Sequence, residues 1–320
     1  MKKRKINISG ISKNLADSIK DEKSTKKYNK SKSLSNLRVA ISVSDSEDLE
    51  MLGLSSNHLK DVSIEIARYL IFNGAVLIYG GDLRVGGYTE LFSELSRQYK
   101  RINDSSIRIE NYFTYPILNS IDSKTRASFL ATGVKVVDAK FPELINENIS
   151  LKTKVHNEYL IAKHLSKMRE KMVIESDSRI LIGGKVKNYK GFYPGIFEEA
   201  YYQLKNNKPL YIVGGFGGAA RILYDIVVYN NHNEFTDEFQ FTSIKNKKFR
   251  KTAQNYGDSN NFNDLKSFFK LYSLEKISSM NGLSVYENKI LAESQNIHEI
   301  VFLLIQGLTR LKRITYITEK

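Results

Sequence analysis

The sequence predicts an α/β domain with a doubly wound parallel sheet and a helical C-terminal extension. Short apolar strands alternate with segments whose apolar residues recur at helical spacing, a pattern typical of parallel β-α-β units. Three of these strands run directly into glycine loops, at residues 80–87, 183–191 and 214–218. With 320 residues and an apolar share of 41%, the chain has ample material for one large core.

The first part of the chain is expected to form a strand, a helix, a second strand, a glycine loop and a second helix. Residues 38–44 are rich in β-branched side chains and form the first strand. The helix that begins near Ser56 is expected to stop at Gly74, after which residues 75–79 form the second strand. This order predicts parallel strands joined by right-handed crossovers.

The order of strand, glycine loop and helix N-terminus occurs twice more between residues 163 and 221. A long helix of mixed charge is expected at residues 152–176, before the first of these two strands. A helix N-terminus beside a glycine loop exposes backbone N–H groups to an anion at the carboxyl edge of a parallel sheet. The remaining strands are expected at residues 107–112, 134–137, 180–182 and 209–213.

The chain is expected to divide into a basic tail (1–36), a domain (37–229), and a loop insertion with C-terminal helices (230–320) packed on the same domain. The tail holds eleven Lys and Arg against three acidic residues, and we expect it to be disordered. It is either a solvated tail or a segment with weak, non-specific attraction to nucleic acid. More than half of the net charge of +14 lies there, so the rest of the chain gives little support for nucleic-acid binding. Residues 230–262 lack a clear period and are expected to form a long loop.

Composition excludes several classes of function. The chain has no Cys, hence no disulfide, no thiolate chemistry and no Cys-based zinc site, which suits a cytoplasmic protein. Its five His residues show no metal-ligand spacing, so we expect no metal and no required cofactor. No apolar run approaches the roughly 18 residues of a membrane helix. The aromatic residues are scattered rather than grouped as a base-stacking platform.

The glycine loops and the end of the first strand supply the candidate ligand-binding residues. Glycine lets a ligand approach the backbone closely, and a phosphate gains from the oriented N–H groups of a helix N-terminus. Arg84 is a candidate phosphate clamp, and Asp82 is a candidate partner for ribose or for an arginine. A tight turn, close helix–strand packing or, for the serines, a helix cap would explain the same residues without a ligand. The candidates are Ser42, Ser44, Gly80, Gly81, Asp82, Arg84, Gly86, Gly87, Gly183, Gly184, Lys185, Gly195, Glu198, Gly214, Gly215, Gly217 and Gly218.

Three motifs, in this order, resemble those of a known family. Tyr-Gly-Gly at 79–81, with Gly-Gly at 86–87, looks like the family's Tyr-Gly-Gly loop. Met-Arg-Glu-Lys-Met at 168–172 looks like its Arg-Lys-x-x-Met helix, and Gly-Ile-Phe-Glu-Glu at 195–199 looks like the end of its Pro-Gly-Gly-x-Gly-Thr-x-x-Glu loop. Over residues 38–228 the chain therefore resembles the SLOG superfamily. This Rossmann-like group holds the LOG cytokinin-activating phosphoribohydrolases, the "lysine decarboxylase-like" proteins and the Smf/DprA proteins.

The resemblance implies an active site in which Glu199 and Arg169 work together on an N-glycosidic bond. Glu199 would hydrogen-bond the ribose or activate water at the anomeric carbon, and Arg169 would balance the charge. The chain departs from the LOG pattern, because residues 185–194 interrupt the catalytic loop and Ile196 replaces its threonine. These departures put hydrolysis in doubt more than they do the fold. The pattern looks closer to stand-alone prokaryotic SLOG proteins, for which a role in defence signalling is predicted.

Two functions from different classes follow, with a third more distant. The first is a sensor or binding module for a nucleotide-derived ligand, of the NAD, ADP-ribose, cyclic nucleotide or nucleoside phosphate class. The second is an N-glycosidic hydrolase that cleaves such a compound with Glu199 and Arg169. Nucleic-acid binding is the distant alternative. The resemblance also implies self-association, and we expect a homodimer.

Overall fold

The computed structural model describes residues 32–101, 103–144, 153–230 and 232–318. Within this part, the chain from Ser33 onward forms one compact unit. The basic tail predicted for residues 1–36 lies almost entirely outside the described residues. In the described ranges no helix is long and apolar enough to cross a membrane.

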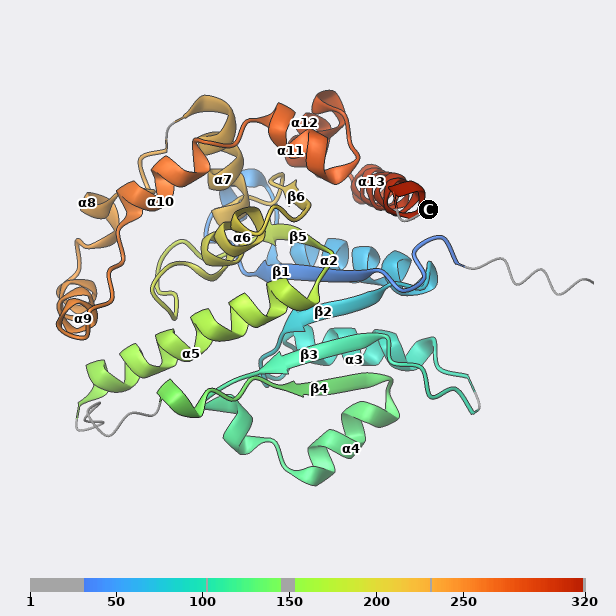
Figure 1. The fold of residues 1–320 in the computed structure, drawn as a ribbon, viewed down its shortest axis with the longest axis horizontal. Coiled ribbons are helices and arrows are strands. Elements are labelled where there is room, and N and C mark those ends of the chain that lie inside the picture. The colour runs from blue at the N-terminus through green and yellow to red at the C-terminus, as the bar shows by residue number, and fades with distance from the viewer. Residues whose placement is uncertain (1–31, 102, 145–152, 231, 319–320) are drawn as a thin grey trace, which may run out of the picture. The chain divides into compact units, whose positions relative to one another are not determined.

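Among the described residues, six strands form one parallel sheet in the order β4-β3-β2-β1-β5-β6 (Figure 1). The predicted doubly wound α/β fold is therefore confirmed, and each strand lies within two residues of its predicted place. The order reverses between β1 and β5, which is the position where ligands bind in sheets of this kind. The strands are β1 (Arg38–Ser44), β2 (Val76–Gly80), β3 (Ile109–Phe113), β4 (Val134–Asp138), β5 (Ser178–Gly183) and β6 (Leu210–Val213).

Helices cover both faces of the sheet (Figure 1). In β1, Val39 and Ile41 pack in one core cluster with α2, whereas Ala40 packs in another with Met168 and Met172 of α5. This alternation follows from the two-residue period of a strand. The helices are α2 (Ser56–Phe72), α3 (Tyr88–Gln98), α4 (Ser123–Ala131), α5 (Lys154–Glu175), α6 (Gly195–Lys205), α7 (Gly218–Tyr229), α8 (Asp237–Gln240), α9 (Ile244–Asn255), α10 (Phe262–Phe269), α11 (Leu274–Asn281), α12 (Val285–Glu293) and α13 (Ile297–Thr318). Short 3-10 helices lie at Glu50–Leu52, Ile117–Ser120 and Pro142–Leu144.

The prediction of a long loop at residues 230–262 is wrong, because this segment contains α8 and α9. Each helix has an N-cap: the side chain of Thr236 accepts from Phe239 N, and that of Ser243 accepts from Asn246 N. The helical period of α9 is weak because its sequence is dominated by polar and basic residues and buries only Ala253 fully. The helix is held mainly by contacts with distant residues, which a local pattern cannot reveal.

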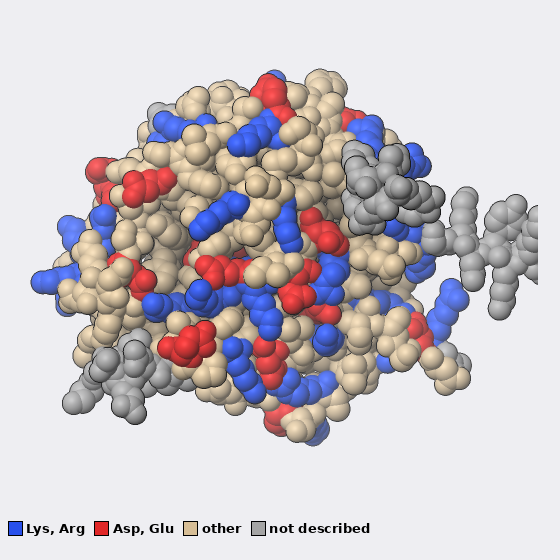
Figure 2. All heavy atoms as spheres, viewed as in Figure 1, with Lys and Arg blue, Asp and Glu red and all other residues tan. Residues whose placement is uncertain are grey.

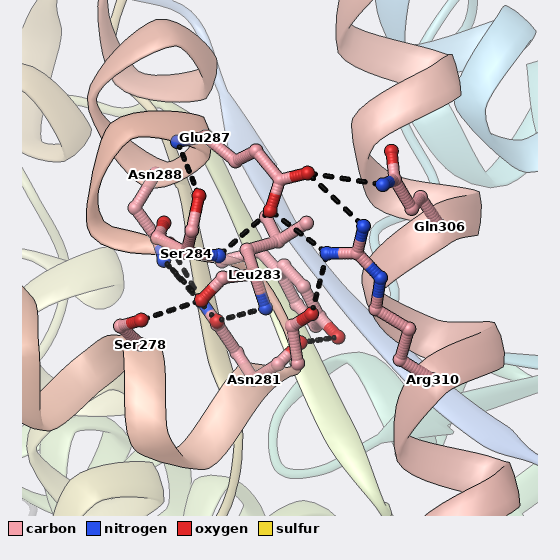
Figure 3. Close-up of polar contacts among 10 residues, drawn as sticks. Ser278, Asn281, Leu283, Ser284, Glu287, Asn288, Gln306 and Arg310 are labelled. Carbon is pink, nitrogen blue, oxygen red and sulfur yellow. Dashed lines mark hydrogen bonds and ion pairs between the residues drawn. The ribbon is translucent and has the colours of Figure 1, made fainter.

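The C-terminal helices are anchored on the edge strand β6. Asn281, at the end of α11, donates from its side chain to Leu210 O at 2.9 Å and accepts from the Tyr211 hydroxyl at 2.7 Å. Figure 3 shows this cluster of polar contacts, in which Glu287 of α12 also faces Arg310 of α13. Leu304 and Leu308 of α13 lie in the same core cluster as Tyr211. The C-terminal extension therefore packs on the sheet.

Candidate functional site

A buried network of four charged side chains lies where α5 and α6 pack on the sheet. Arg179 of β5 places Nη1 2.6 Å from Glu199 Oε2, and Arg169 of α5 places Nε 3.5 Å from Glu199 Oε1. Arg169 also donates from Nη1 to Glu198 Oε2. Arg169 and Glu199, which the resemblance implies as partners, are thus brought together, but each has a second partner of opposite charge.

Two hydroxyl groups complete this network. Ser42 of β1 donates to Glu199 Oε2 and accepts from Arg179 Nη1 at 2.8 Å. Ser166 of α5 donates to Glu198 Oε1. Ser42 was predicted to contact a ligand, but it is only 4% exposed and its hydroxyl is used inside the network.

Burial and pairing set the charges in the network. Burial raises the pKa of Glu198, against the attraction of Arg169. Burial disfavours the charged form of Arg169, but the two glutamates outweigh it and raise the pKa of that guanidinium. Burial lowers the pKa of Arg179, which Glu199 opposes. The two positive charges of the guanidinium groups balance the two negative charges of the carboxylates. Removal of one group would therefore leave a buried charge without full compensation.

Two glycines make room for the Arg169 guanidinium beneath the loop that follows β5. A Cβ on Gly195 would lie 2.9 Å from Arg169 Nη2, and one on Gly191 would lie 3.0 Å from Nη1. Gly191 also has a φ of +119°, which side chains rarely adopt. Gly195, a predicted ligand contact, therefore has a packing role. Gly191 and Arg179 are network residues that the sequence reasoning missed; a charged residue inside the apolar strand β5 was the available signal for Arg179.

Polar groups of the first glycine loop pair with one another and with α3. Arg84 Nη2 lies 2.5 Å from Asp82 Oδ2, and Gly86 N donates to Glu90 Oε2 at 2.6 Å. A Cβ on Gly81 would overlap the side chain of Asn111, so packing requires that glycine. Similarly, a Cβ on Gly80 would meet Met168 Cε at 3.3 Å, and one on Gly87 would meet Asp82 Oδ1 at 2.7 Å. The loop borders an open hollow of about 810 Å³, to which Asp82, Arg84 and Gly86 all contribute.

The loop at residues 214–218 is packed against other parts of the chain. Asp48 accepts from Gly218 N with both carboxylate oxygens, at 2.9 and 3.1 Å, at the N-terminus of α7. A Cβ on Gly217 would overlap that same carboxylate. A Cβ on Gly215 would overlap the carbonyl oxygen of Ser294, and one on Gly214 would lie 2.7 Å from Ala292 O. A phosphate at this helix N-terminus would have to displace Asp48.

The loop after β5 is fastened to β1 and α7 at the point where the strand order reverses. Ser44 accepts from Gly184 N at 2.9 Å with its carbonyl and from Lys185 N at 3.2 Å with its hydroxyl. Gly184 O in turn accepts from Ala219 N at 2.9 Å. Gly183 and Gly184 have φ values of +60° and +105°, left-handed conformations that favour glycine. The predicted residues Ser44, Gly183, Gly184 and Lys185 are therefore neighbours at this position.

A comparison with models of protein families shows to which family this chain belongs. The model described as SLOG cluster2 matches residues 33–291, most of the chain. The chain belongs to the SLOG superfamily. No curated protein matches it. The match continues beyond the segment that carried the resemblance and includes α8–α11, so these helices are part of the SLOG cluster2 unit.

The SLOG unit has a second cavity, which the sequence reasoning missed. It has a volume of about 800 Å³ and lies between α5, residues 187–191, and the α8–α9 segment; we call it the α9 cavity. Lys187, Lys190 and Phe239 are among its lining residues. The sequence placed Lys187 and Lys190 in the insertion of the catalytic loop, but it predicted a loop where α9 forms the opposite wall.

Two further observations concern surface charge and metal-ligand groups in the described part of this SLOG protein. In the face shown in Figure 2, Lys and Arg are interspersed with Asp and Glu rather than gathered by sign. That face therefore lacks the continuous basic patch typical of nucleic-acid binding. The described residues contain no group of three or more His, Asp or Glu that could hold a metal ion.

Proposed function

We propose that this SLOG protein binds a nucleotide-derived ligand at the carboxyl edge of its sheet, as a sensor or binding module, and leaves the ligand intact. The observation that carries this proposal is the pairing of Glu199. Its Oε2 accepts from both Arg179 and Ser42, and its Oε1 faces Arg169 at 3.5 Å. Membership of the SLOG superfamily supports a nucleotide-related role.

This pairing makes Glu199 a poor catalyst. A carboxylate that stabilises an oxocarbenium-like centre or activates water needs an oxygen that can reach the reacting atoms. The side chain of Glu199 is only 13% exposed, and that of Arg169 is 8% exposed beneath Gly191 and Gly195. Turning Glu199 outward would leave Arg179, which is fully buried, without its carboxylate.

Hydrolysis of an N-glycosidic bond is the second candidate. It is favoured by the proximity of Arg169 and Glu199, the two residues that the SLOG resemblance implies for catalysis. In this function the remaining exposure of Glu199 would admit the anomeric carbon of a nucleotide or NAD-like substrate.

Product analysis separates the two functions. Purified protein is incubated with AMP, NAD, ADP-ribose and cyclic nucleotides, followed by mass spectrometry and proton NMR, with thermal-shift readings alongside. We expect one compound to stabilise the protein, as a ligand of the native state must, and to remain chemically intact. Release of free base with ribose phosphate, lost in Glu199→Gln, would instead establish the hydrolase.

The oligomeric state is part of the proposal. Self-association and a setting in prokaryotic defence are implied by the resemblance, and we propose a homodimer. A monomeric mass at micromolar concentration would contradict it.

A further inference from the structure

The α9 cavity carries an excess of positive charge. Lys187, Lys190 and Lys245 line it together with one acidic residue, Glu158. Lys245 Nζ lies 3.4 Å from Glu158 Oε1, so those two charges offset each other. Among the described residues, neither Lys187 nor Lys190 forms an ion pair. Two lysines in a concave, partly apolar site attract an anion more strongly than the same lysines on an open surface.

Aromatic side chains also line the cavity. Tyr189, from the same loop as the lysines, lines the cavity together with Phe239 of α8 and Phe249 of α9. The ammonium of Lys187 lies 4.7 Å from the centroid of the Phe239 ring. Rings beside lysines suit a ligand with a planar aromatic group and an attached anion, because bases stack on aromatic faces while phosphates pair with ammonium groups.

A buried acceptor without a partner also lines the cavity. Asn260 is only 2% exposed; its Nδ2 donates to Phe192 O at 3.3 Å, but its Oδ1 has no hydrogen-bond partner. A buried polar atom left unpaired is costly, and most such atoms in proteins are paired. Asn260 Oδ1 is itself buried, so a ligand in the cavity would pair with it only after the side chain turned toward the cavity.

The hollow beside the first glycine loop has the opposite charge. Three carboxylates and one guanidinium line it, and Asp82 already pairs with that guanidinium, Arg84. Glu94 pairs with Arg97, which lies outside the lining, at 2.6 Å. Among the described residues, Glu90 is thus the one lining carboxylate without an ion pair, and the hollow offers a phosphate no unpaired cation. The carboxylates are those of Asp82, Glu90 and Glu94.

We infer that the α9 cavity is the place where this protein binds its nucleotide-derived ligand, with the base against the aromatic rings and the phosphate on Lys187 and Lys190. The inference rests on the proposed function, and it adds the position of the ligand. It assigns the insertion at residues 185–194, which interrupts the catalytic loop of the LOG enzymes, to ligand binding. It also assigns the α8–α9 segment as the opposite wall of the site.

Isothermal titration calorimetry with AMP, ADP-ribose, NAD and cyclic nucleotides tests this position. We expect the dissociation constant of the bound compound to rise at least tenfold in the double variant Lys187→Gln/Lys190→Gln. Loss of stacking in Phe239→Leu should weaken binding several-fold. Lys248→Gln, which removes one exposed charge from α9 outside the cavity, is the matched control and should bind as the wild type does.

The outcomes distinguish a wrong binding position from a wrong proposed function. If a compound binds but neither cavity variant changes its affinity, whereas Arg84→Ala weakens it, the inference is overturned and the proposed function stands. If none of these compounds binds the wild type, both are overturned. Because Lys187 and Lys190 are exposed, circular dichroism and the melting temperature of the double variant should match the wild type. Phe239→Leu gives an independent reading if they do not.

Discussion

Arg179 donates from Nη1 to Glu199 Oε2 at 2.6 Å, and its side chain has no exposed surface. A buried charge without its partner is strongly destabilising. We therefore predict that Arg179→Met lowers the free energy of unfolding by about 3–5 kcal/mol, measured by urea denaturation. In the double variant Arg179→Met/Glu199→Gln, which also removes the carboxylate that has lost its closer partner, we expect part of the loss to be recovered.

A partly exposed ion pair provides the control. Arg38 pairs with Glu110, but the side chain of Arg38 is 29% exposed. Arg38→Met should lower the free energy of unfolding by only about 1 kcal/mol. A loss in the double variant equal to the sum of the losses in Arg179→Met and Glu199→Gln would show that the two residues are not coupled, contrary to the prediction.

The sheet could be predicted from the sequence because its strands are short, apolar and rich in β-branched residues, each bounded by glycine or polar loops. The parallel direction of the strands then follows from the helical crossovers, whereas their order in the sheet comes from the structure. The α9 helix could not be predicted, because only Ala253 is fully buried and its packing partners, Tyr159 and Phe192, are distant in the chain. The α9 cavity was missed for the same reason.

The glycine loops show the other limit of sequence reasoning. A glycine required by a ligand and one required by close packing look alike in a sequence. Gly215 packs on Ser294, and Gly81 packs on Asn111, so the deciding neighbours lie far along the chain. Similarly, the motifs that resemble the SLOG family indicated Arg169 and Glu199, but not the second arginine that neutralises the glutamate.

We predict that Asp48 stabilises the N-terminus of α7 and keeps anions from binding there. Its carboxylate accepts from Gly218 N, and a negative charge there also interacts favourably with the helix dipole. Asp48→Ala should lower the free energy of unfolding by about 1–2 kcal/mol. Because Asp48→Ala leaves Gly218 N without its acceptor, inorganic sulfate should raise the melting temperature of this variant more than it raises that of the wild type. Glu47→Ala, an exposed neighbour of the same charge, should show neither effect; an equal response to sulfate in all three proteins would exclude this role.

The contact between α12 and α13 is predicted to be sensitive to acid. The hydrogen bond from Arg310 is the largest of the effects that lower the pKa of Glu287, from 4.5 to about 2 (Figure 3). A carboxylate whose pKa is lower in the folded state stabilises the fold above its unfolded pKa, and the contribution is lost as the pH falls from 4.5 to about 2. Glu287→Gln should therefore cost about 1 kcal/mol at pH 7.

The difference in stability between Glu287→Gln and the wild type should shrink as the pH falls toward 2 and vanish below it, where both side chains are uncharged. Unfolding in urea across this pH range measures the difference. Glu238→Gln on α8, an exposed glutamate, should show no comparable pH dependence. A constant difference between Glu287→Gln and the wild type at every pH would mean that the ion pair does not stabilise the contact.

The last prediction distinguishes packing from ligand contact in the loop at residues 214–218. Gly215→Ala places a methyl group on the carbonyl oxygen of Ser294, so we expect a loss of about 2–3 kcal/mol of unfolding free energy from overpacking. Gly86→Ala meets no atom within 4 Å, and its φ of +68° should cost only about 1–2 kcal/mol. If the role of Gly215 is packing, Gly215→Ala protein that remains folded should bind nucleotides with wild-type affinity in calorimetry. Wild-type stability with lost affinity would instead place the ligand at this loop, because a methyl group that the fold tolerates would then be blocking the ligand.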